Sequence, residues 1–182
     1  MATTRLMTAD ELLTLPDDGT RYELIEGVPQ RMSPGGLEHG SIGRRMATRM
    51  GAFVDDHGLG EVFGPDTGFI IRRNPDTILV PDVSFVRTDR LPPPGAWAGY
   101  GDVVPDLVVE VVSPHDRMPD IAAKIAVYLD AGVPIVWSVH PLSRSARVHR
   151  AGRETMIVGP GDILDGGEVL PRFQLPVTEI FR

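Results

Sequence analysis

The sequence of 182 residues contains no cysteine. This absence excludes disulfide bonds, cysteine nucleophiles and thiolate zinc sites, and it is compatible with a reducing cytoplasm, where we expect the protein to act. No uncharged apolar stretch approaches the roughly 20 residues of a membrane-spanning helix, and the first residues lack the apolar segment of a signal peptide. We therefore expect neither membrane insertion nor secretion.

Motifs that bind organic cofactors or perform other hydrolytic chemistry are also missing. The sequence has no G-x-S-x-G elbow, no P-loop and no H-E-x-x-H. Gly36, Gly40 and Gly43 lie in a helical stretch rather than after a strand, which argues against a dinucleotide site. We therefore expect no organic cofactor.

Basic residues are fewer than acidic ones, 18 against 25, so the formal net charge is −7. This balance argues against a protein that coats nucleic acid. It still allows a nuclease that holds DNA with a local basic strip and places its acids around a metal. Arg44, Arg45 and Arg49 form the candidate strip on one helix, and the alternative is an ordinary solvated helix face.

The remaining composition is that of an ordinary globular protein, with 42% hydrophobic and 24% charged residues. The length suits one domain, so residues 1–182 are predicted to form a single unit. Strand-like and helix-like segments alternate along the chain. The predicted fold class is therefore α/β, with a mixed β-sheet flanked by helices and additional β-hairpins.

Three helices are predicted: one from the Thr8–Glu11 capping box through Leu15, one over about Leu37–His57 that ends at Gly58, and one that begins near Pro119 and closes at Gly132. Strands are predicted over Tyr22–Met32 (two, turning near Glu26), Val62–Phe63, Gly68–Arg72, Ile78–Val86, Asp106–Val112 and Ile135–Val139, followed by hairpins to Phe181. Residues 91–105 are predicted to form a long functional loop.

Two acids interrupt strongly apolar strands: Asp82 in ILVPDVSFV and Glu110 in DLVVEVV. Burying an isolated charge is prohibitive, and a divalent cation is the simplest partner for two such acids. The alternative is structural. Asp82 would mark a bulge or edge at Pro81, and Glu110 would be a satisfied core acid.

Lys124 lies on the apolar face of the predicted third helix, three residues after Ile121 and four before Tyr128. An ammonium near the end of the Glu110 strand would offset the two carboxylates and hold an attacking water. The alternative is a lysine whose stem covers the apolar stripe while its charge reaches solvent.

The order of these residues resembles the PD-(D/E)XK nuclease superfamily, in which an acid is followed by a second acid two positions before a lysine. Val112 stands here in the lysine position. The whole chain is similar to one branch, the Uma family of restriction-endonuclease-like proteins, in which the lysine lies on the following helix. The similarity is carried by Tyr22–Gly27, Ser33-Pro34 with His39, Val80-Pro81-Asp82, Pro105–Pro114, Asp120 with Lys124 and Tyr128, Ala131–Val133, Trp137 and Leu175–Phe181. Ile135 and His140 depart from the family pattern, in which an acid is common at the first position and an aspartate is usual at the second.

The resemblance implies a restriction-endonuclease-like domain that cleaves DNA with Mg²⁺ or Mn²⁺. Asp82, Glu110 and the backbone carbonyl of Val111 would bind the metal, and Lys124 would orient the water or stabilise the transition state. The resemblance also implies a homodimer.

Two further residues have competing interpretations. Glu23 is either an additional acid of the site or an exposed acid on a hairpin. His39, which faces inward with Ile42 and Met46, is either near the phosphate or a hydrogen-bonded core residue. His115 is a weaker candidate.

Two rival functions remain open from the sequence. One is a nucleic-acid-binding or assembly module that keeps the fold with little cleavage activity. The other is hydrolysis of a different phosphodiester, which would use the same residues.

Overall fold

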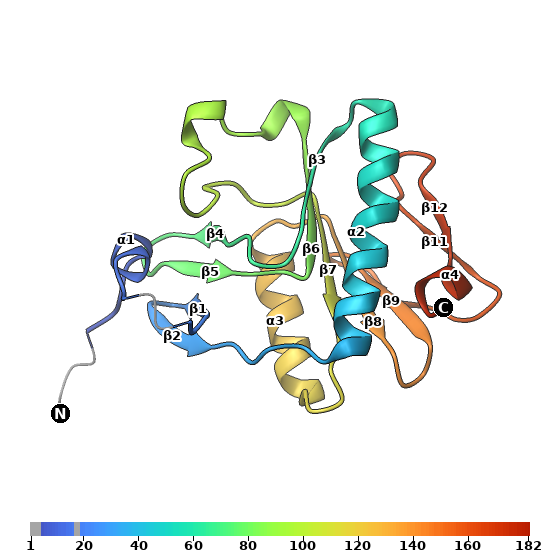
Figure 1. Ribbon diagram of the computed structural model, residues 1–182, viewed down its shortest axis with the longest axis horizontal. Helices are drawn as coiled ribbons and strands as arrows, with labels where there is room; N and C mark the ends of the chain where they lie inside the picture. Colours follow the sequence, from blue (N-terminus) through green and yellow to red (C-terminus); the bar gives the residue numbers. More distant parts are fainter. Residues whose placement is uncertain (1–4, 17–18) are drawn as a thin grey trace.

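A six-stranded mixed sheet forms the centre of the computed structural model, which describes residues 5–16 and 19–182 (Figure 1). Its strand order is β10-β9-β8-β7-β6-β3, and only β7 and β8 are parallel. The strands are β3 (Gly60–Phe63), β6 (Val83–Arg87), β7 (Leu107–Val111), β8 (Ile135–His140), β9 (Ser145–His149) and β10 (Met156–Val158).

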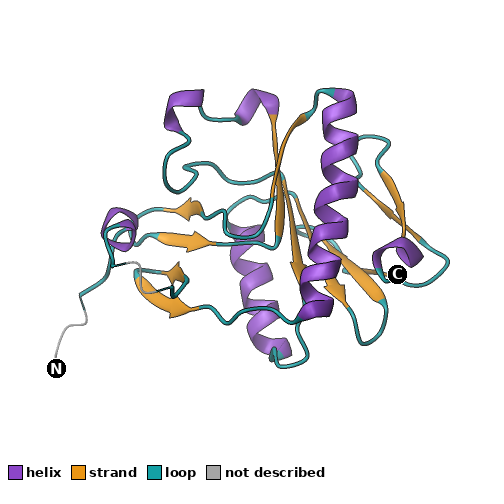
Figure 2. Cartoon of the chain, in the orientation of Figure 1, coloured by secondary structure: helices purple, strands orange, loops and turns teal. Residues whose placement is uncertain are grey.

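Helices cover both faces of this sheet (Figure 2). Side chains alternate across a strand, so Val109 packs with α2 (Leu37–His57) while Val108 packs with α3 (Met118–Asp130). α3 connects β7 to β8, as a crossover between parallel strands requires. The α2 face is also covered by β11 (Ile163–Asp165), β12 (Gln174–Pro176) and α4 (Val177–Ile180).

A second sheet of four strands, in the order β2-β1-β5-β4, lies beside the first. Its members are β1 (Tyr22–Ile25), β2 (Val28–Arg31), β4 (Phe69–Arg72) and β5 (Thr77–Leu79). The 91–105 segment contributes a bridge between Gly101 and Phe69 at its edge. This segment includes a 3₁₀ turn, η2 (Pro94–Ala96), and follows another, η1 (Thr88–Arg90).

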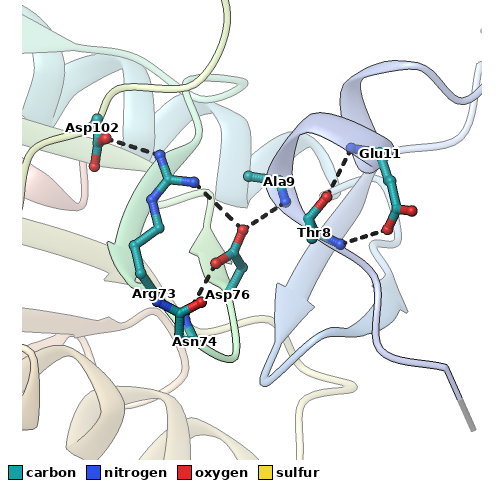
Figure 3. Close-up of polar contacts among 7 residues, drawn as sticks. All are labelled: Thr8, Ala9, Glu11, Arg73, Asn74, Asp76 and Asp102. Atoms are coloured by element: carbon teal, nitrogen blue, oxygen red, sulfur yellow. Dashed lines mark hydrogen bonds and ion pairs between the residues drawn. The ribbon is translucent and has the colours of Figure 1, made fainter.

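The short helix α1 (Ala9–Leu13) is fixed to the second sheet by Asp76 (Figure 3). Thr8 and Glu11 form the predicted capping box, and the Ala9 amide donates to Asp76 Oδ2 at 2.8 Å. Arg73 joins Asp76 to Asp102 in the long loop. One buried carboxylate therefore ties together the N-terminal helix, the β4–β5 turn and the loop.

The predicted fold class is confirmed, and two element predictions are wrong. Residues 78–86 do not form one strand. The chain leaves the four-stranded sheet after Leu79 and enters the six-stranded sheet at Val83, because Val80-Pro81-Asp82 breaks the ladder. The C-terminal segment ends in the helix α4 rather than in a hairpin.

Among the described residues, no helix has both the length and the apolar character needed to cross a membrane.

Candidate functional site

Asp82 and Glu110 meet because of the register between β6 and β7. Val83 lies opposite Val109, so continuing the antiparallel ladder by one residue puts Asp82 opposite Glu110. The Val111 amide donates to Asp82 Oδ2 at 2.7 Å, which fixes the aspartate beside the end of β7. Asp82 therefore lies at the junction of the two sheets, not inside a strand.

Glu110 is buried, with 7% of its surface exposed, and its carboxylate is contacted by side chains of α3. Lys124 Nζ lies 2.9 Å from Oε1 and 3.0 Å from Oε2, and the Tyr128 hydroxyl donates to Oε1 at 2.7 Å. The two helix residues are one turn apart and therefore reach the same carboxylate. Lys124 is turned inward between carboxylates, with its side chain 18% exposed, so it is not a stem with its charge in bulk solvent.

Glu23 joins this cluster from the other sheet. It is buried on β1, its Oε1 lies 2.9 Å from Lys124 Nζ, and it accepts from the Val80 amide at 2.9 Å. It is therefore not an exposed hairpin acid. Lys124 bridges one acid of the four-stranded sheet and one of the six-stranded sheet.

His39, near the start of α2, contacts the remaining acid. Its Nε2 lies 3.2 Å from Asp82 Oδ2, and this hydrogen bond raises the pKa of His39 despite its partial burial. Gly35 permits this arrangement, because a Cβ at that position would lie 2.6 Å from His39 Nδ1. The imidazole thus supports Asp82 from the side of α2.

The cluster carries more negative than positive charge. Burial, together with the neighbouring acids Asp82 and Glu23, raises the pKa of Glu110 to about 7, although Lys124 opposes this shift. Burial lowers the pKa of Lys124, but Glu110 and Glu23 outweigh that effect and hold the pKa above its ordinary value. Two carboxylates, Glu23 and Glu110, therefore hold one lysine that stays charged, and Asp82 adds a third acid beside Glu110.

This donor set fits a hard divalent cation, because carboxylate oxygens are its preferred ligands and its charge offsets the excess of acids. Asp82 and Glu110 would supply the carboxylates, and Val111 brings its backbone to the same place. Within residues 5–16 and 19–182, no group of three or more His, Asp or Glu side chains is arranged to hold a metal. A cation here would therefore need the backbone carbonyl and waters as further ligands.

Other candidate residues lie away from this cluster. His115 is exposed in the turn after β7 and makes no hydrogen bond or ion pair with a described residue. Arg45 donates to the carbonyls of Ile180 and Arg182, and Arg49 pairs with Glu179. Of the predicted basic strip, only Arg44 has its side chain exposed and without a partner in the described part of the chain.

Three features of the cluster escaped the sequence-based prediction. Tyr128 was placed on the apolar stripe and among the residues that carry the family resemblance, but it was given no role in the site. Neither Gly35 nor the Val80 amide stood out. One overlooked signal points to the site directly. The sequence has 17 arginines but a single lysine, and that lysine is Lys124. Arginine supplies every other fixed side-chain cation, so this lysine stands out as a candidate for a role that uses a compact ammonium.

Comparisons with known proteins agree with this fold. The model of the Uma2 family, described as "Putative restriction endonuclease", matches residues 9–178. The crystal structure of a putative nuclease belonging to DUF820 from Anabaena variabilis ATCC 29413 superposes with a TM-score of 0.84. That match has 22% sequence identity and covers 96% of this chain and 97% of the other. Among curated proteins, none matches the sequence.

Proposed function

Because the chain belongs to the Uma2 family of putative restriction endonucleases, we propose that it is a divalent-metal-dependent endonuclease that hydrolyses DNA phosphodiester bonds. The observation that carries the proposal is the meeting of Asp82, Glu110 and Lys124 at the junction of two sheets. Each of these polar groups comes from a different element, and a core that needed only stability would place apolar side chains there.

Mg²⁺ or Mn²⁺ bound by Asp82, Glu110 and the Val111 carbonyl would polarise the scissile phosphate and lower the pKa of a bound water. The chain's own residues act around that centre. Lys124 donates to the attacking water or to the phosphate oxygen that gains charge. Glu23 and Tyr128 hold Lys124 and Glu110 in position. His39 fixes the rotamer of Asp82.

Cleavage assays test this proposal. Supercoiled plasmid and duplex oligonucleotides are incubated with the protein and Mg²⁺ or Mn²⁺, with and without a chelator. We expect nicking or cutting that the chelator abolishes. Asp82→Asn and Glu110→Gln should abolish both cleavage and metal binding while the fold is retained. Asp56→Asn, the same change at an exposed position on α2, is the matched control.

Cleavage that survives the chelator, or wild-type activity in both site variants, would refute the metal-dependent mechanism. Calorimetric titration separates the rival module from the enzyme, because a protein with no catalytic role has no reason to keep a metal site. A homodimer belongs to the same proposal, since paired sites can address both strands. Sedimentation of the protein with and without DNA tests this assembly.

A further inference from the structure

A second polar cluster lies on the same face of the six-stranded sheet as Glu110. Ser138 lies opposite Glu110 in the β7–β8 ladder, and Arg147 lies opposite Ser138 in the β8–β9 ladder. Neighbouring strands are about 4.8 Å apart, so the Arg147 backbone is roughly 10 Å from that of Glu110. With His140 and His149, which share this face, Ser138 and Arg147 form what we term the arginine–histidine cluster.

The serine at its centre joins the two imidazoles. Ser138 Oγ lies 2.9 Å from Nε2 of both His140 and His149, and His149 Nδ1 lies 3.2 Å from Thr155 Oγ1. Two proton arrangements satisfy these bonds, because a hydroxyl donates once and accepts from the other side. In one of them, Ser138 donates to His140 Nε2, and the Nδ1–H of His140 remains as a donor without a described partner.

Arg147 has no anionic partner in the part of the chain that the structure describes. It is half-buried, its Nε is fully buried without a hydrogen bond, and no described carboxylate forms an ion pair with it. Burial and the charge of Arg147 lower the pKa values of both histidines, and no acid counters either shift. Two other partly buried arginines do have partners: Arg90 pairs with Asp106, and Arg45 donates to backbone carbonyls.

A partly buried guanidinium without a partner is costly, and its planar fork matches a phosphate or a carboxylate. Glu110, which shares this face of the sheet two strands away, belongs to the candidate metal site, and the acids of that site would repel a polyanion. An anionic group of the substrate would pair with the Arg147 guanidinium. This contact would also anchor the substrate, which the acidic site by itself would repel.

We propose that the arginine–histidine cluster binds a backbone phosphate of the nucleic acid, adjacent to the phosphate that Asp82, Glu110 and Lys124 address. Arg147 supplies the charged fork, and the Nδ1–H of His140 supplies a neutral donor, while Ser138 holds the imidazole in place. The identity of the ligand rests on the proposed function, whereas the presence of an anion site does not.

The test is equilibrium binding of a fluorescent duplex oligonucleotide in chelator, so that no cleavage occurs. Arg147→Met should weaken binding about tenfold or more, the scale of one charge-assisted hydrogen-bonded contact. It should also reduce the slope of log K against log salt by about one unit. The oligonucleotide affinity of Arg147→Lys should lie between those of wild type and Arg147→Met. Arg153→Met is the matched control. It removes the same charge from an exposed arginine of the same hairpin, and this variant should bind the oligonucleotide like wild type.

Steady-state cleavage with metal gives a second readout. Arg147→Met should raise KM while kcat stays within a few-fold, because the cluster holds the strand and not the reacting atoms. If Arg147→Met fails to fold, as judged by thermal unfolding, His140→Asp replaces it. The new carboxylate of His140→Asp would pair with Arg147 and repel the phosphate, so this variant should also weaken oligonucleotide binding.

Wild-type affinity and salt slope in Arg147→Met would overturn the inference, even if cleavage is confirmed. Arg147-dependent binding without cleavage by any variant would leave the inference standing and refute the proposed enzyme. Competition with inorganic phosphate separates the sources of the anion. Phosphate binding that needs Arg147, together with oligonucleotide binding that does not, would overturn the assignment to a nucleic acid strand.

Discussion

Lys124 is the residue whose replacement discriminates most sharply between chemistry and packing. Lys124→Met keeps the apolar stem beside Ile121 and Tyr128 and removes the ammonium. Turnover should fall about a hundredfold or more, the usual loss for one electrostatic donor at a transition state. Metal affinity should stay within a few-fold of wild type or tighten, because an ammonium repels Mg²⁺. Oligonucleotide cleavage and calorimetric titration give the two values.

The same substitution has a cost in the metal-free protein. It leaves Glu23 and Glu110 without their shared cation, and removing one partner of a buried ion pair costs about 3–5 kcal/mol. The unfolding temperature without metal should therefore fall. Lys124→Arg restores the charge and serves as the control for stability. Full turnover in Lys124→Met would reduce Lys124 to a structural ion-pair residue.

His140 should give the protein a measurable loss of stability in acid. Burial lowers its pKa to about 4, whereas an unfolded histidine binds a proton near 6.5. The unfolded state therefore binds more protons below pH 6.5, and stability is lost as the pH falls from there toward 4, by at most about 2–3 kcal/mol. Urea unfolding of wild type and His140→Gln at pH 7.5 and 4.5 measures this loss. An equal loss in both proteins would contradict the assignment.

Among single residues, the site members that could be predicted from the sequence are those that interrupt an apolar pattern. Asp82, Glu110 and Lys124 each put a charge where the neighbours are hydrophobic. Tyr128 does not, since a tyrosine fits an apolar stripe and only its hydroxyl contact reveals the role. Arg147 was equally hidden, because alternation in a strand also produces ordinary arginines, and an unpaired guanidinium is visible only once its neighbours are known.

Among the elements, those with a clear stop signal were predicted closely. The long helix ends at His57 because Gly58 adopts a left-handed conformation with φ 60°. The run 78–86 was misread because both of its halves are apolar, so periodicity does not reveal a change of sheet. Pro81 was noted as a mark of a bulge or edge. Its actual effect is to end the ladder of one sheet before that of another begins.

The C-terminal helix α4 offers a test at the level of one element. Arg45 donates to the Ile180 carbonyl at 2.9 Å, which docks α4 on α2. Arg45→Met should lower the free energy of unfolding by about 1–2 kcal/mol, the scale of a charge-assisted hydrogen bond that is partly exposed. Arg44→Met changes the exposed neighbour on the same helix and should be near neutral. Equal losses in both variants, measured by urea unfolding, would argue against the docking role.

On the scale of the whole molecule, the site joins its two larger sheets. Glu23 comes from one, Glu110 from the other, and Asp82 from the crossing between them. Mg²⁺ or Mn²⁺ should therefore raise the unfolding temperature of the entire protein. A free metal concentration of 100 times Kd adds about 2.7 kcal/mol to the free energy of unfolding. Differential scanning fluorimetry of wild type, Asp82→Asn and Asp56→Asn measures the shift, which should vanish only in Asp82→Asn. A wild-type shift in that variant would show that the metal binds elsewhere.

A chain with a single lysine carries a single ε-amine, and in this fold two carboxylates hold it. Biosynthetic incorporation of lysine labelled with ¹³C at Cε would therefore mark the site and no other position. The Cε resonance would need no assignment by mutagenesis, because it has only one possible origin. Its chemical shift would follow metal and nucleic acid in solution, which makes this protein suited to NMR observation of its candidate site.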